Sequence, residues 1–212
     1  MSVKNGAVPS EDTKTMFTIT PFFPDPKKKL KTREFLEASE GLVTIIDKFG
    51  KVFAPVVNDM NGNITKLRTK YNEDIEQHED LEDMILKDKV EGDLVSADAL
   101  LWLRRALHFM AIFFQFVIID AQSQVLSQDL TPFVKKAYAS TLERHHGWLG
   151  TQLFNVLSRF APTRKSLTFT LGLEKNHKDK IVMCDMIRYH VNLDGCVNRL
   201  REFFAEHQLE NI

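Results

Sequence analysis

Apolar residues recur at helical spacing over most of the chain after residue 31, and no segment shows the alternation of a β-strand. We predict helices over about 32–49, 55–71, 75–89, 96–124, 131–160, 165–173 and 178–209. The second of these carries a continuous apolar stripe, formed by Val56, Met60, Ile64, Leu67 and Tyr71. The pattern predicts an all-α domain of roughly seven or eight helices.

Segment 96–124 is apolar nearly all round, so its helix is expected to be buried on most sides. Ser96 is the predicted N-cap of this helix, as Thr32 is of the first. The longest apolar run, Phe109 to Ile119, is shorter than the stretch of about 20 residues that crosses a bilayer. We therefore interpret it as part of a core helix. Sixteen phenylalanines suit either a packed core or a pocket for acyl chains.

Residues 1–31 are interrupted by four prolines and end in a run of lysines, which predicts an N-terminal arm before a single domain over 32–212. Four apolar residues are expected to hold part of this arm on the domain: Phe17, Ile19, Phe22 and Phe23. The lysine run is read as a solvated linker in preference to a weak contact with anionic lipid headgroups.

Composition narrows the function classes. The chain has 212 residues, of which 43% are hydrophobic and 27% charged, as in a folded domain with one large core. A formal net charge of −1 provides no basic excess, which disfavours nucleic-acid binding. Cys184 and Cys196 have no metal-ligand spacing, and the N-terminus resembles no signal peptide. We expect a cytoplasmic protein with reduced thiols.

The common catalytic motifs are missing from the sequence. It contains no phosphate-binding loop, dinucleotide fingerprint, nucleophile elbow or zinc-protease helix. His145 and His146 are adjacent, so on a helix they would point about 100° apart and could not chelate one metal. We expect a protein that is not an enzyme and that uses no metal or cofactor.

Three polar residues of the second helix share one face: Asp59, Asn63 and Lys66 lie at spacings i, i+4 and i+7. The row borders the apolar stripe, and Gly62 within it would leave room for a bulky group. Carboxylate, amide and ammonium groups together can both accept from and donate to sugar hydroxyls. Spacing alone, however, favours an ordinary exposed helix edge.

Two further segments combine aromatic and polar side chains. Trp102 precedes Arg104 and Arg105, and its indole could stack on a sugar, although a core tryptophan is the commoner case. His146 is predicted to share a helix face with Leu142, Leu149 and Leu153, where a hydrogen-bonded core histidine is again commoner. Trp148 fits either the core or a membrane interface.

Together these segments resemble the glycolipid transfer protein family, in the family's order. The resemblance covers most of the chain from Thr32 to about Pro162. It rests on Thr32-Arg33-Glu34-Phe35-Leu36-Glu37-Ala38, Asp59-Met60-Asn61-Gly62-Asn63-Ile64-Thr65-Lys66, Leu101-Trp102-Leu103-Arg104-Arg105 and His146-Gly147-Trp148.

The resemblance implies a two-layer all-α sandwich of about eight helices that encloses a hydrophobic lipid pocket. Asp59 and His146 would bind the ceramide amide, and Asp59 with Asn63 and Lys66 would hydrogen-bond the first sugar. Trp102 would stack on that sugar, and Trp148 would dock the protein on a membrane. A monomer would then carry glucosyl-, galactosyl- or lactosylceramide between membranes, without nucleic acid as a partner.

Other readings stay open. One branch of the family carries ceramide-1-phosphate; it replaces the asparagine by a cation and holds the phosphate with an Arg-xxx-Arg pair. In this chain Asn63 is retained, and the positions of such a pair would hold Trp102 and Ala106. A glycolipid sensor that acts through a partner is a further alternative. Some members have a tyrosine tail at the headgroup, whereas this chain ends Leu209-Glu210-Asn211-Ile212. That contact is therefore not expected, nor is a motif for an endoplasmic-reticulum partner between residues 41 and 49.

Overall fold

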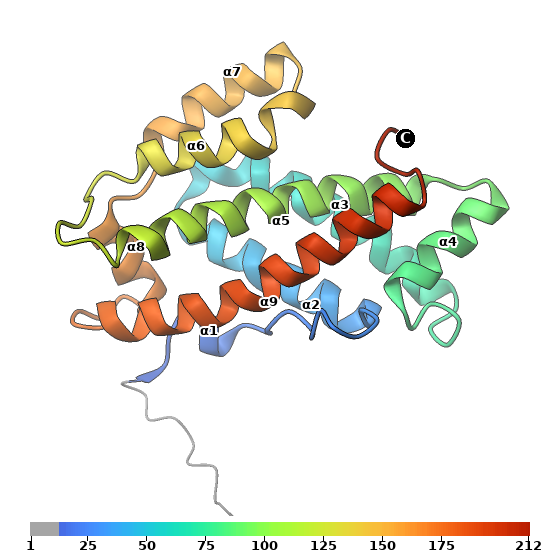
Figure 1. Ribbon diagram of the computed structural model, residues 1–212, viewed down its shortest axis with the longest axis horizontal. Helices are drawn as coiled ribbons and strands as arrows, with labels where there is room; N and C mark the ends of the chain where they lie inside the picture. The colour runs from blue at the N-terminus through green and yellow to red at the C-terminus, as the bar shows by residue number, and fades with distance from the viewer. Residues whose placement is uncertain (1–12) are drawn as a thin grey trace, which may run out of the picture.

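The computed structural model describes residues 13–212, and its helices within that range are shown in Figure 1. Regular structure among these residues is helical, apart from isolated bridges that pair Lys31 with Asp80 and Asp129 with Thr163. The elements are α1 Met16–Ile19, α2 Thr32–Asp47, η2 Lys51–Phe53, α3 Ala54–Glu73, α4 Leu81–Glu91, α5 Val95–Asp120, α6 Thr131–Thr141, η3 Glu143–His145, α7 Trp148–Leu157, η4 Ser158–Phe160, α8 Arg164–Leu171 and α9 Asp179–Glu206. The all-α prediction is confirmed.

Helix α5 is the centre of the packing. It contacts α3, α6 and α9, while α2 packs on α3, and Figure 1 shows α5 crossing the middle of the molecule beside α9. By length and composition α5 could span a membrane, because the full helix is longer than its apolar run. Its apolar side chains, such as Leu100, Leu103, Leu107 and Phe114, are nevertheless buried among the other helices. A core helix passes the same test, and the packing supports that interpretation.

Residues 13–31 pack closely on the helices. Phe17 and Phe23 are fully buried, whereas Ile19 and Phe22 are exposed. The prediction that these four residues anchor the arm is therefore confirmed for Phe17 and Phe23 only. A Cβ at Gly195 of α9 would lie 2.4 Å from Cγ of Pro26, so the missing side chain lets the arm cross α9. Gly195 therefore has a packing role within α9. The boundary between arm and domain at residue 31 remains a prediction.

Several predicted helix ends differ from the structure. Thr32 is the first helical residue of α2 and not its cap; its hydroxyl donates to the carbonyl of His78 at 2.6 Å. Ser96 lies inside α5, whose N-cap is Leu94. Helix α4 begins at Leu81 and not at residue 75, because residues 75–78 form a turn and Asp80 pairs with Lys31. At Thr32 the contact with the distant residue His78 takes the place of the predicted cap.

The predicted helix over 131–160 is broken into α6 and α7. At the break, His146 has extended dihedral angles, φ −94° and ψ 131°, and Gly147 caps α7. His146 therefore does not share a continuous helix face with Leu142, Leu149 and Leu153, and that prediction is wrong. Glycine is a poor interior helix residue and an accepted N-cap, which allows the chain to restart here.

Candidate functional site

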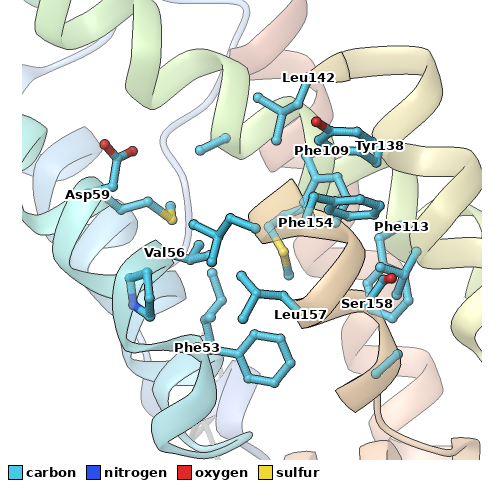
Figure 2. Close-up of a pocket in the computed structure, with 18 of the residues that line it drawn as sticks. Phe53, Val56, Asp59, Phe109, Phe113, Tyr138, Leu142, Phe154, Leu157 and Ser158 are labelled. Carbon is cyan, nitrogen blue, oxygen red and sulfur yellow. The ribbon is translucent and has the colours of Figure 1, made fainter. Parts of the chain in front are cut away.

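A cavity of about 400 Å³ lies between α3, α5, α6 and α7. Its wall is almost entirely apolar. Figure 2 shows Phe53, Val56 and Leu157 facing one another across it, with Asp59 at one end and Phe113 and Ser158 at the other. The other apolar lining residues include Ile46, Phe49, Met60, Phe109, Met110, Phe114, Val134, Leu153 and Phe154. Such a wall offers dispersion and apolar burial, and it fits a hydrocarbon chain.

Three polar or amphipathic residues that the sequence singled out line this cavity: Asp59 from α3, Trp102 from α5 and His146 from the break between α6 and α7. The rings of Trp102 and His146 lie 6.3 Å apart between centroids, with 23° between their planes. Residues distant in sequence thus meet at one polar end of an apolar cavity. This arrangement can bind a molecule with a polar head and a hydrocarbon body.

Asp59 and His146 influence each other electrostatically. Partial burial raises the pKa of the Asp59 carboxyl, and the nearby His146 and Lys66 side chains act against that rise. Burial likewise lowers the pKa of His146 below 6.5, and the Asp59 carboxylate acts against that fall. His146 is therefore neutral at pH 7, which leaves one ring nitrogen as a donor and the other as an acceptor.

The Tyr138 hydroxyl fixes the orientation of His146. It lies 3.1 Å from Nδ1 of His146 and 3.4 Å from Oγ1 of Thr151. When the hydroxyl donates to Nδ1, the shorter of the two bonds, the imidazole proton lies on Nε2 and can be donated to a ligand. The Tyr138 ring is itself stacked on Phe154, with centroids 3.6 Å apart. Tyr138 therefore connects the apolar wall to the polar end of the cavity.

Asn63 and Lys66 lie beside the cavity and do not line it. The Asn63 side chain is buried, and its Nδ2 donates to the Asp59 carbonyl oxygen at 3.1 Å. Lys66 is exposed on the same side of α3. A Cβ at Gly62 would have no atom within 4 Å, so space around this glycine is open. The predicted polar row is real, but only Asp59 reaches the cavity directly.

Trp148 lies on the outside of α7 and is 73% exposed, so the core alternative for this residue is wrong. Four other large apolar side chains of α7 and η4 are also exposed: Leu149, Leu153, Val156 and Phe160. We call these five residues the α7 patch. Leu153 of this patch also lines the cavity, so the patch borders the apolar interior directly.

The sequence analysis did not identify Tyr138. The only feature that could have indicated it is its position eight residues before His146. The sequence analysis also missed the contact between Glu210, near the C-terminus, and Arg104. Beside it on α5, Arg105 lies over the Trp102 ring, 4.7 Å from the ring centroid. Among residues 13–212, no group of three or more His, Cys, Asp or Glu side chains is placed to hold a metal ion.

Replacing Asp59 by Asn should lower the pKa of His146 further. The substitution removes the negative charge that favours the imidazolium and leaves the burial that opposes it. The pKa is measured from the pH dependence of the imidazole C–H chemical shifts by NMR. Asp179→Asn, at the start of α9, is the matched control and should not change it. An unchanged or raised His146 pKa in Asp59→Asn would contradict the coupling.

Comparison with known proteins agrees with this geometry. The family model for glycolipid transfer proteins matches residues 30–173. The glycolipid transfer protein of Danio rerio is 29% identical over 186 residues, which cover 84% of this chain and 88% of the relative. The crystal structure of HET-C2, a fungal glycolipid transfer protein, has a TM-score of 0.75 and 28% identity, covering 92% of this chain and 95% of that one.

The structure of mouse ceramide-1-phosphate transfer protein shares the fold, with a TM-score of 0.79 at 18% identity and coverage of 93% of this chain and 95% of that one. Both kinds of lipid carrier thus use this two-layer helical sandwich. Because the family model matches more than half of its residues, the chain belongs to the glycolipid transfer protein family.

Proposed function

We propose that the protein binds a glycosphingolipid by its ceramide amide and first sugar and transfers it between membranes. The observation that carries the proposal is an apolar cavity whose polar end joins Asp59, Trp102 and His146. Relatives named as glycolipid transfer proteins support the same ligand class.

In this proposal Asp59 and His146 bind the two sides of the ceramide amide. The Asp59 carboxylate accepts from the amide N–H, and Nε2–H of His146 donates to the amide carbonyl. An amide buried without such partners costs about 1–3 kcal/mol, so the pair selects lipids that contain this group. Tyr138 contributes indirectly: when its hydroxyl donates to Nδ1, the imidazole proton lies on Nε2 and is available to the lipid.

The first sugar is placed against Trp102, with Lys66 and Asp59 at its hydroxyls. An aromatic ring suits the apolar C–H face of a pyranose, and the charged groups supply strong hydrogen bonds. Asn63 donates to the Asp59 backbone carbonyl, so it would hold the helix edge or contact the sugar through its amide oxygen. Asn63 and Ala106 also leave two positions without the cations of the phosphate-binding branch, which favours a sugar headgroup.

Transfer requires that loading and release be nearly balanced. Each CH₂ buried in the cavity contributes about 0.8 kcal/mol relative to water, but a bilayer gives the lipid almost the same stabilisation. The headgroup contacts therefore decide which lipid is extracted. The proposed process breaks no covalent bond and needs no metal or cofactor, and the lipid is recovered intact.

The α7 patch is the proposed membrane contact. Trp148 is favoured at bilayer interfaces, and the neighbouring aliphatic side chains can enter the acyl boundary. Docking by this face would set the cavity wall against the membrane from which lipid enters. We place the protein in the cytoplasm as a monomer; two free cysteines suit that reducing compartment.

Asp59→Asn should lower galactosylceramide transfer between vesicles by about tenfold to a hundredfold, since a charged acceptor for the amide is lost. Labelled galactosylceramide and ceramide-1-phosphate are followed in parallel, and Asp179→Asn serves as the control. Transfer of ceramide-1-phosphate in preference would overturn the sugar assignment and keep the lipid carrier. A folded protein that transfers neither lipid would overturn the carrier itself.

Trp148→Ala should slow transfer and weaken association with vesicles, while affinity for a short-chain galactosylceramide in solution stays unchanged. The residue contacts the membrane in this account and lies outside the cavity. Vesicle co-sedimentation and tryptophan-independent ligand titration separate the two effects. Val90→Ala, at an exposed apolar residue outside the α7 patch, is the matched control. Loss of solution affinity with normal vesicle association would contradict the assignment.

A further inference from the structure

Three arginines lie near His145, and one of them, Arg105, covers the ring of the cavity residue Trp102. Arg104 and Arg105 follow it on α5, and Arg144 comes from η3 with His145. Arg105 covers one side of the Trp102 ring, with its guanidinium carbon 4.7 Å from the ring centroid. The positive charges lower one another's proton affinity: after burial, Arg144 is among the causes that lower the pKa of Arg105. Like charges held together in this way need an anion.

The C-terminal tail supplies one anion. Nη2 of Arg104 donates to Oε2 of Glu210 at 2.7 Å, and Nη2 of Arg105 donates to the Glu210 carbonyl oxygen at 3.1 Å. Arg104 is only 5% exposed, so its guanidinium is a buried cation that this carboxylate neutralises. A buried, paired guanidinium is the kind of group that binds a planar or tetrahedral oxyanion well. The cluster therefore already binds a carboxylate of its own chain.

One carboxylate does not use all the donors of the cluster. Nε of Arg104 and Nε of Arg105 are buried without a hydrogen-bond partner. Arg144 is exposed and donates to Nε2 of its neighbour His145 at 3.1 Å. Burial, followed by the charge of Arg105, lowers the pKa of His145 to about 4, so this imidazole is neutral at pH 7. Arg105 therefore has an unused donor over Trp102, and Arg144 adds an exposed cation near Arg105.

We propose that this cluster is a subsite for an anionic substituent on the sugar of the bound lipid, and that Glu210 occupies it until such a lipid arrives. The inference rests on the proposed function, because it needs the sugar to lie on or beside Trp102. An exocyclic sulfate on that sugar would extend toward Arg105 and Arg144 and displace the C-terminal tail, in which the Glu210 carbonyl binds Arg105 and the Glu210 carboxylate binds Arg104. A phosphate attached directly to ceramide offers the same oxyanion chemistry nearer to the amide.

The experiment compares transfer of three labelled lipids between neutral vesicles: galactosylceramide, sulfated galactosylceramide and ceramide-1-phosphate. The variants are Glu210→Gln, which removes the internal carboxylate and keeps a hydrogen-bond acceptor, and Arg144→Gln, which removes an exposed cation. Arg33→Gln, at an exposed residue of α2 paired with Glu37, is the control. Thermal unfolding of each variant verifies that it is folded.

We expect the ratio of sulfated to neutral galactosylceramide transfer to rise about tenfold in Glu210→Gln and to fall about tenfold in Arg144→Gln, as for one charge-assisted hydrogen bond. Arg33→Gln should keep the wild-type ratio. Because Arg144 is exposed, its substitution tests the subsite even if Glu210→Gln unfolds the tail.

Three results would overturn the inference. The first is an unchanged ratio in Glu210→Gln and Arg144→Gln while galactosylceramide is still transferred, which leaves the proposed function standing. The second is faster transfer by Glu210→Gln of ceramide-1-phosphate alone, which would place the oxyanion on ceramide and not on the sugar. The third is transfer of neither glycolipid by the wild type, which would overturn the proposed function together with the subsite.

Discussion

The apolar surface of helix α5 is shared between the protein core and the cavity, and the rest of the structure depends on this division. One side packs against α3 and α9 to form the core. Phe109, Met110 and Phe113 instead face the cavity, although they also touch core residues. Filling this space with protein side chains would stabilise the fold by burying more apolar surface. Because the cavity is not filled by side chains and its wall is apolar, it can receive a hydrocarbon chain in preference to water.

The polar end of the cavity is built by elements that reach it from three directions. Asp59 comes from α3 and Trp102 from α5. His146 comes from the extended segment between η3 and α7. Partial burial shifts the pKa of Asp59 upward and that of His146 downward, and the attraction between their charged forms opposes both shifts. The pair can therefore offer a carboxylate acceptor and a neutral imidazole donor at the same pH, which suits an amide.

Local sequence patterns predicted the parts of this arrangement that depend on helical periodicity. The apolar stripe of α3 correctly placed Met60 and Ile64 in the core, and with them the neighbouring polar row. The break at His146 was missed because helical spacing continues through Gly147 into α7. The contact of Glu210 with Arg104 was missed for a different reason. It joins residues 106 apart in sequence, and no local rule encodes such a pairing.

The central claim is that the cavity receives the hydrocarbon of the lipid while the headgroup stays at Asp59, Trp102 and His146. Photolabelling with galactosylceramide that carries a diazirine in its acyl chain, followed by peptide mass spectrometry, tests this most directly. The account predicts labels on cavity residues such as Phe109, Phe113 and Leu157, and their loss when unlabelled galactosylceramide is added in excess. Labels confined to α7 patch residues outside the cavity, such as Trp148 and Leu149, or labels that competition does not remove, would contradict it.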